Sequence, residues 1–150
     1  MQQQFDILNA TRNNILNAIK DLSLDQLNTV PKGFKNNIAW NVAHIVVTQQ
    51  LLCYKLSGLD IELNAAFVDR FKKGSEASNI TQNELDSIKN QLLDFSNQLE
   101  GDYNGGLFKN YNEYPTSYNV TLNSIEDAIQ FNNVHEGVHF GYIMAMKKSV

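Results

Sequence analysis

The sequence is poor in several residue types, and each shortage excludes a class of protein. A single cysteine, Cys53, allows no internal disulfide and is typical of a reducing compartment. Two prolines and eight glycines leave long uninterrupted stretches, which disfavours a sandwich of many short strands. The length of 150 residues and the hydrophobic fraction of 43% fit one globular domain, residues 1–150, with its own core.

Basic charge and long apolar runs are also scarce. The formal net charge is −4, whereas a protein that binds duplex nucleic acid concentrates Lys and Arg on one face, so we expect no nucleic-acid partner. The longest stretch without a charged residue, residues 36–54, contains too many Asn, Gln, His and Thr side chains to span a membrane. Residues 1–6 lack the basic and apolar parts of a signal peptide. We therefore expect a cytoplasmic protein with no membrane partner.

What the sequence does contain is helical periodicity in four long segments. Apolar residues recur every three or four positions, as on one face of a helix, in residues 5–22, 37–56, 82–101 and 124–147. In the first segment polar residues, Arg12 among them, lie between the apolar positions. Helix starts are predicted at Asn36 or Asn37 and at the pairs Ser23 with Gln26, Thr81 with Glu84, and Asn123 with Glu126.

The connections between these segments are long. A short amphipathic piece, residues 67–73, precedes Gly74, and residues 102–121 are aromatic and rich in Asn and Gly without a clear period, which leaves room for an extended segment. Connections of this length disfavour a simple up-down-up-down arrangement. The sequence therefore predicts an all-α protein, a four-helix bundle with long crossover connections.

All three histidines fall on stripes that we assign to the bundle interior. His135 and His139 are four residues apart and so share one helix face, the spacing that two ligands of one metal ion require. His44 lies on the stripe of Trp40 and Val47. Three imidazoles on one ion would leave a fourth position open, which is the pattern of catalytic zinc. The alternative is three structural histidines, because a single buried histidine is more often a hydrogen-bonded core residue.

Residues 135–139 read HEGVH and so match the H-E-x-x-H motif of zinc proteases, in which the glutamate is a general base. However, none of the residues after His139 is His, Asp or Glu, so a third ligand is missing there. We interpret the match as coincidental, with Glu136 a solvated carboxylate or one beside the ligands. A di-iron bundle would need Glu-x-x-His on two helices, and the chain has that spacing once, in Glu136 and His139.

Residues 38–45 (IAWNVAHI) and 135–143 (HEGVHFGYI) resemble the DinB-like family of metalloenzymes, and residues 71–75 (FKKGS) are similar to the turn that those proteins carry before the third helix. The resemblance implies an up-down-down-up four-helix bundle, commonly a homodimer. It also implies a divalent metal, nickel or zinc, held by His44, His135 and His139. Gly141 matches the small residue usual after the last ligand, whereas Tyr142 stands where glutamine is more frequent.

Some members of that family transfer low-molecular-weight thiols such as bacillithiol, mycothiol or glutathione to electrophiles, and others are described as hydrolases. The resemblance therefore implies a metal-dependent thiol S-transferase or hydrolase whose partners are a small thiol or electrophile. A metal ion could activate either the thiol or water. The alternative is a non-catalytic dimeric bundle that keeps the metal site, and no catalytic residue is assigned.

Other residues have simpler readings. Cys53 lies on a different helical face from His44, so we expect an inert buried thiol. Trp40 is expected either in a cavity wall or in the core. Tyr111, Tyr114 and Tyr118 form either a lid over the site or a cover for the end of the bundle.

Overall fold

The computed structural model describes all 150 residues and is dominated by helices. The elements in chain order are α1 (Gln2–Ile19), α2 (Leu24–Asn28), α3 (Ile38–Gln49), a π-helical turn η1 (Gln50–Tyr54), a 3₁₀ turn η2 (Lys55–Ser57), α4 (Ala65–Phe71), α5 (Gln82–Asn104), β1 (Tyr114–Pro115), β2 (Thr121–Leu122) and α6 (Ile125–Met146). The two short strands pair antiparallel within the aperiodic stretch, where the sequence left room for an extended segment.

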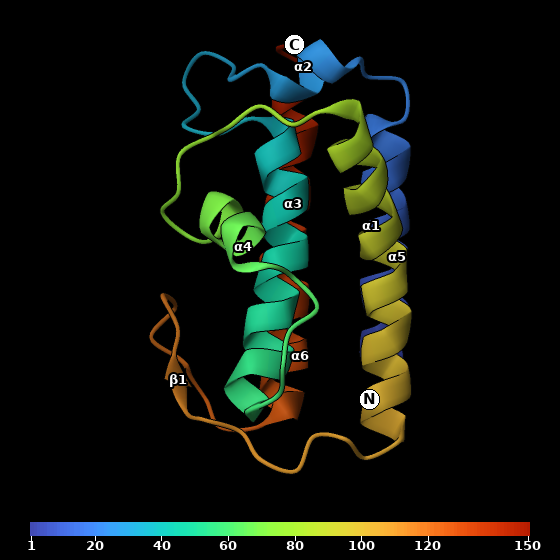
Figure 1. Cartoon of the computed structure of the whole chain (residues 1–150), viewed down its shortest axis with the longest axis vertical. Helices are drawn as coiled ribbons and strands as arrows, with labels where there is room; N and C mark the ends of the chain where they lie inside the picture. The colour runs from blue at the N-terminus through green and yellow to red at the C-terminus, as the bar shows by residue number, and fades with distance from the viewer.

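The four long helices form the bundle that the sequence predicts (Figure 1). The chain runs up α1, down α3, down α5 and up α6, so the order is up-down-down-up. Both α1 and α3 pack against α5 and α6. The connection from α3 to α5 returns along the whole bundle and carries α4, whereas the other two connections cross the bundle ends. No helix has both the length and the apolar character needed to cross a membrane.

Side-chain caps begin most of these helices, as the sequence indicates. Capping boxes open α2 at Ser23 and α5 at Thr81, and the Asn37 side chain accepts from the backbone N–H of Trp40. The prediction for α6 is wrong by one residue. Ser124, not Asn123, is the N-cap, and its hydroxyl accepts from the N–H of Asp127 at 3.1 Å. The pattern was ambiguous because Ser124 and Asp127 have the same spacing as Asn123 and Glu126.

The second predicted helix changes its geometry before it ends. It continues beyond Gln49 through the π-helical and 3₁₀ turns and stops at Gly58, whose φ of 75° is left-handed. A π turn adds one residue to a helical turn and is common near functional sites. It begins two residues after Thr48 and six after His44, in the part of the helix that borders the candidate site described below.

A layer of buried polar side chains divides the core into two apolar clusters. Arg12, which the sequence places among polar positions between apolar ones, is fully buried between Leu8 of one cluster and Ile15 of the other. Glu136 is fully buried as well, so of the two positions expected for it, the solvated one is wrong. The Arg12 guanidinium donates to both Glu136 carboxylate oxygens, with the shortest contact, Nη2 to Oε1, at 2.7 Å.

The polar layer joins all four long helices. Arg12 on α1 also donates to the backbone carbonyl of Leu92 on α5 at 2.7 Å and to the side-chain carbonyl of Gln49 on α3 at 2.9 Å. Asn132 on α6 donates to Glu136 at 2.8 Å. Because a buried charge is costly unless it is paired and hydrogen-bonded, this complete set of partners is what permits Arg12 and Glu136 in the interior.

Candidate metal centre

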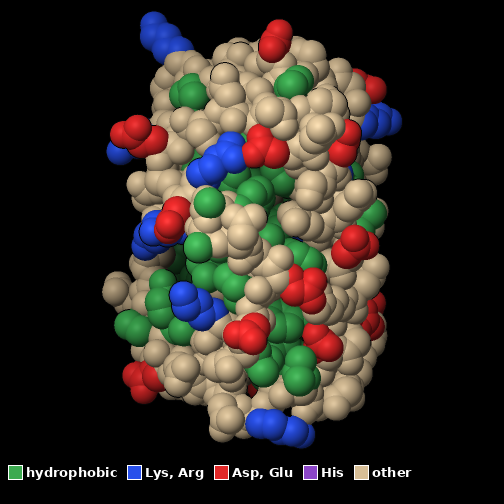
Figure 2. Space-filling view, viewed as in Figure 1, with side chains coloured by type: hydrophobic (Ala, Val, Ile, Leu, Met, Phe, Trp, Pro, Cys, Tyr) green, Lys and Arg blue, Asp and Glu red, His purple; other side chains and the backbone are tan.

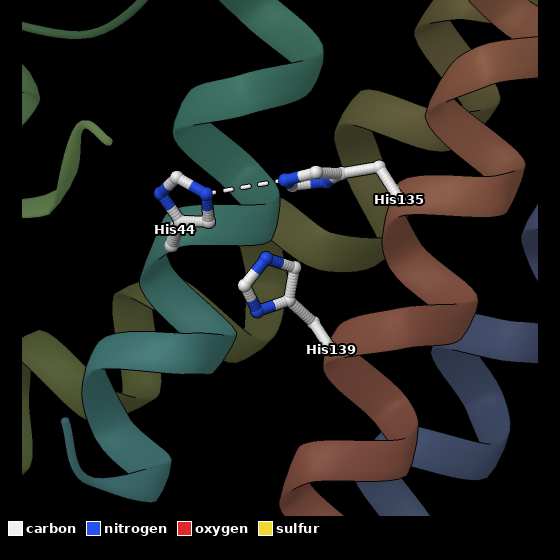
Figure 3. A group of neighbouring side chains, drawn as sticks. All are labelled: His44, His135 and His139. Carbon is white, nitrogen blue, oxygen red and sulfur yellow. Dashed lines mark hydrogen bonds between the residues drawn. The ribbon is translucent and has the colours of Figure 1, made fainter. Parts of the chain in front are cut away.

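The three histidines converge between α3 and α6 (Figure 3). His44 comes from α3, and His135 and His139 come from successive turns of α6, with the three rings pointing toward one another. One ligand nitrogen from each lies within 4.8 Å of the other two. The structure thus brings together the residues that the sequence singles out, from positions more than 90 residues apart in the chain. Their role as metal ligands stays a prediction.

The antiparallel packing of α3 on α6 sets this arrangement. Consecutive helical residues are about 100° apart around the axis, so His135 and Glu136 cannot share a face. Glu136 turns into the polar layer, and His135 and His139 turn toward α3. Both carboxylate oxygens of Glu136 contact Arg12, and the hydrogen bonds of Glu136 include no histidine. The H-E-x-x-H spacing is therefore not a protease site in this fold.

Two of the imidazoles are held by hydrogen bonds at Nδ1. His44 Nδ1 lies 2.6 Å from the carbonyl oxygen of Phe71, the last residue of α4, and a carbonyl can only accept. His139 Nδ1 lies 2.7 Å from Asn41 Oδ1, and the Asn41 amide nitrogen donates to the Asn37 carbonyl, which fixes the orientation of the amide. Both Nδ1 atoms therefore carry the proton, and both Nε2 atoms present a lone pair. Metal-binding histidines are typically oriented in this way by a partner on the other ring nitrogen.

The third imidazole, His135, lacks such a partner. Its Nδ1 is buried without a hydrogen bond from the protein, and its Nε2 faces His44 Nε2 at 3.1 Å. Neighbouring nitrogens of a tetrahedral zinc site are separated by about 3.3 Å when each Zn–N bond is about 2.0 Å. The spacing of these two nitrogens is therefore compatible with ligands of one ion, as is the donor set of three imidazoles.

Burial keeps all three histidines uncharged. It lowers the pKa of His44, against a smaller opposing effect from the Phe71 carbonyl. Burial, reinforced by the neighbouring histidines, lowers the pKa of His135 to about 2, and burial together with His44 lowers the pKa of His139 to about 3. Neutral imidazole is the form that binds metal, so these histidines need no deprotonation near neutral pH.

A cavity of about 850 Å³ opens beside the histidines and gives them access to small molecules. Trp40 lines it and stacks on His44, with ring centroids 4.4 Å apart and an angle of 11° between the planes. Trp40 is also 5% exposed and belongs to the larger apolar cluster, so both expectations for it hold. Tyr142 lies in the cavity wall as well.

The tyrosines of the aperiodic stretch divide into two groups. Tyr114 and Tyr118 line the cavity from the β1–β2 hairpin, where a lid was one of two expectations. Tyr111 instead packs against the smaller apolar cluster, which includes Cys53. Cys53 is fully buried, and burial raises its pKa to about 12, so the structure supports an inert thiol outside the histidine group.

Several residues that support the site are not apparent from the sequence. The Phe71 carbonyl is a backbone group, for which no side-chain motif exists. Asn41 does leave a signal, because it is a polar residue on a strongly apolar helix three positions before His44. Both act on the ring nitrogens that point away from the convergence point of the histidines.

Comparison with known proteins places the chain in one family. Among curated proteins none matches it. The model of the DinB superfamily, in contrast, matches residues 7–143, which covers nearly the whole chain and includes His44, His135 and His139. The up-down-down-up bundle and the converging histidines agree with this match, and the chain belongs to the DinB superfamily.

Proposed function

We propose that the protein binds one divalent metal ion through His44, His135 and His139 and uses it in an enzymatic reaction on a small electrophile. The observation that carries the proposal is the orientation of the imidazoles. Two of them are fixed at Nδ1, so that Nε2 is the atom left to bind a metal, and the third faces His44 Nε2, which also has the Thr48 hydroxyl at 3.3 Å. Nickel and zinc are the metals we propose, because imidazole ligands suit both.

The residues around the ligands have definite tasks in this proposal. When bound, the metal supplies a Lewis acid that lowers the pKa of a thiol or water at its open position. The Phe71 carbonyl and Asn41 hold the rings of His44 and His139, and Trp40 covers one face of His44. Apolar side chains, Leu51 and Val138 among them, line the same cavity as the histidines.

Thiol transfer is the reaction that we favour over hydrolysis. No Asp or Glu lines the cavity, so hydrolysis would lack a carboxylate general base. A thiol is far more acidic than water, so a metal ion can hold it as the nucleophilic thiolate near neutral pH without a carboxylate base. We propose low-molecular-weight thiol S-transfer to a small organic electrophile as the reaction, with hydrolysis as the second candidate. A single buried, unpaired cysteine supports our expectation of a reducing, cytoplasmic location.

The metal proposal is tested by elemental analysis of tag-free protein and of His44→Ala, His135→Ala and His139→Ala. Val138→Ala is the matched control, because Val138 lines the same cavity between the two α6 histidines. We expect about one equivalent of nickel or zinc per chain in wild type and control, and its loss in each histidine variant with unchanged helix content. Wild-type protein that cannot be loaded with divalent metal would overturn the proposal. A loaded protein is then assayed for thiol consumption with an aryl halide and for ester hydrolysis.

A second candidate function is a non-catalytic dimeric bundle, favoured by the exposed face of α6. Val134, Val138, Tyr142 and Met144 are exposed there, and Glu136, which is buried, is the one charged residue from Ala128 to Met146. An apolar, charge-free helix face is typical of an interaction surface. We propose that a second copy of the chain covers it. Sedimentation analysis tests this, and a monomer at all concentrations would contradict it.

A further inference from the structure

The charge of the cavity differs from that of the whole protein. The chain has 16 acidic and 12 basic residues, yet the cavity lining contains three lysines and no acidic residue. Lys35 precedes α3, Lys55 begins η2, and Lys73 follows α4. The three lysines are 18 to 38 residues apart in the chain, and all of them line the cavity. The cavity therefore presents positive charge within an acidic protein.

The ammonium groups of these lysines are not engaged within the protein. None of the three forms an ion pair or a side-chain hydrogen bond, whereas the neighbouring Lys72 pairs with Asp69 at 2.6 Å. Lys147, at the end of α6, likewise donates to a backbone carbonyl. Lys35, Lys55 and Lys73 are thus free to bind a ligand anion.

The rest of the lining is suited to an apolar or aromatic body. Aromatic side chains come from several elements, including Phe34, Trp40, Tyr118 and Phe131. On the face that Figure 2 shows, hydrophobic side chains gather beside and below α4, with both basic and acidic side chains among them. A volume of about 850 Å³ is that of a typical small-molecule site. Apolar walls with a few polar groups at defined places are the usual composition of such sites.

From these observations we infer that the cavity binds an amphipathic organic anion, with its apolar or aromatic body among the aromatic walls and its carboxylate or phosphate beside one of Lys35, Lys55 and Lys73, which lie at different heights along the cavity. The inference rests on the proposed function in that it names the class of substrate for that site. A cationic ligand would meet three like charges and no carboxylate in the lining, and a neutral ligand would gain nothing from the three exposed lysines. The sign of the lining charge thus selects among ligands that share the same apolar body.

The test uses three probes with one ring system, namely 2-naphthoate, 2-naphthyl phosphate and neutral 2-naphthol, titrated by calorimetry at pH 7. We expect the better of the two anions to bind about tenfold or more tightly than 2-naphthol, and its affinity to fall as salt increases. Comparison of the two anionic probes distinguishes a carboxylate from a phosphate ligand. Equal binding of 2-naphthol would overturn the inference.

Two triple variants carry the same change in net charge. In Lys35→Gln/Lys55→Gln/Lys73→Gln we expect the anion to bind about tenfold more weakly while 2-naphthol is unaffected. The control, Lys20→Gln/Lys89→Gln/Lys148→Gln, removes three lysines that do not line the cavity, and we expect wild-type affinity. Equal weakening in both variants would show a general charge effect and contradict the inference.

Titration of metal-free and metal-loaded protein separates this inference from the metal proposal. We expect both forms to show the part of anion binding that depends on the three lysines. We also expect equal metal content in the wild type and in the triple variant at Lys35, Lys55 and Lys73. Anion binding that requires metal and is insensitive to the three lysines would overturn the inference and leave the metal proposal intact. Lysine-dependent binding in a protein that takes up no metal would support this inference and overturn the metal proposal.

Discussion

His135 and Glu136 are neighbours in the chain, yet their surroundings differ in almost every respect. The Glu136 carboxylate is fully buried and is satisfied by Arg12 and Asn132. His135 has an unpartnered Nδ1 and an Nε2 that faces another Nε2 beside a cavity. On one face of α6 the buried carboxylate of Glu136 thus has its partners within the fold, whereas on the next face the Nδ1 of His135 has none. The first is suited to fixing the bundle, and the second to binding.

The two faces are coupled by the helix that they share. The polar layer fixes the rotation and height of α6 relative to α1, α3 and α5, because the partners of Arg12 and Glu136 lie on all four helices. The same rotation directs His135 and His139 toward His44. Removing one partner of a buried pair is costly, whereas replacing both with apolar residues is often neutral. The comparison therefore makes separate predictions for each face.

The largest effect is expected on the face of α6 that carries Glu136. Arg12→Met should lower the free energy of unfolding by about 3–5 kcal/mol, because it leaves the Glu136 carboxylate buried without its cation. The double variant Arg12→Met/Glu136→Leu should recover part of that loss, because it removes the unpaired charge but leaves the Gln49 and Asn132 amides without these partners. Urea denaturation measures both, and Lys20→Met provides a control for removing an exposed cation from the same end of the chain. A loss no larger than that of the control would show that the polar layer does not stabilise the fold.

A smaller effect is expected on the face of α6 that carries His135 and His139. Asn41→Leu removes the acceptor that orients His139, and partners of this kind contribute about 10–100-fold to metal affinity. We expect this weakening in chelator competition with nickel or zinc, with the number of metal ions bound per chain unchanged. Asn36→Ala is the control, because Asn36 lines the cavity and has no hydrogen bond to a histidine. Equal metal affinity in Asn41→Leu and wild type would separate Asn41 from the site.

The smallest effect is expected on the third, exposed face of α6. No atom lies within 4 Å of where a Cβ would stand at Gly137 or Gly141, so Ala should fit at both. Each substitution should raise the free energy of unfolding by about 0.5–1 kcal/mol, since glycine is unfavourable inside a helix. Thermal denaturation of dilute protein measures this. A loss of stability together with weaker self-association would instead indicate that the glycines are in close contact with a second copy.

The sequence predicts the repeating features of this fold well and its exceptional residues poorly. Apolar spacing and capping boxes locate the long helices, because both signals are local. The burial of Arg12 is missed because a charged residue is assigned to a polar face by type, although its spacing from Leu8 and Ile15 places it on the apolar stripe. Its partner Glu136 is 124 residues away, and no local pattern joins the two.

The candidate site shows the same division. Spacing brings His135 and His139 to one face, the apolar stripe of Trp40 and Val47 adds His44, and the family resemblance implies the same three residues. The groups that orient the rings are a backbone carbonyl from the α3–α5 connection and an amide on the apolar helix α3, and both depend on tertiary packing. The one-residue shift of the α6 cap to Ser124 has a simpler cause, since two overlapping motifs compete there and only the folded chain selects one.

The long return from α3 to α5 has a consequence for how this protein can be altered. About 11 extended residues would span the roughly 35 Å length of α5, and the connection is more than twice as long. The additional chain forms α4, whose final carbonyl holds His44. Although this segment resembles a dispensable insertion, it therefore holds one imidazole of the site in place. Trimming it to the minimum length would preserve the topology of the bundle and leave one imidazole free to turn.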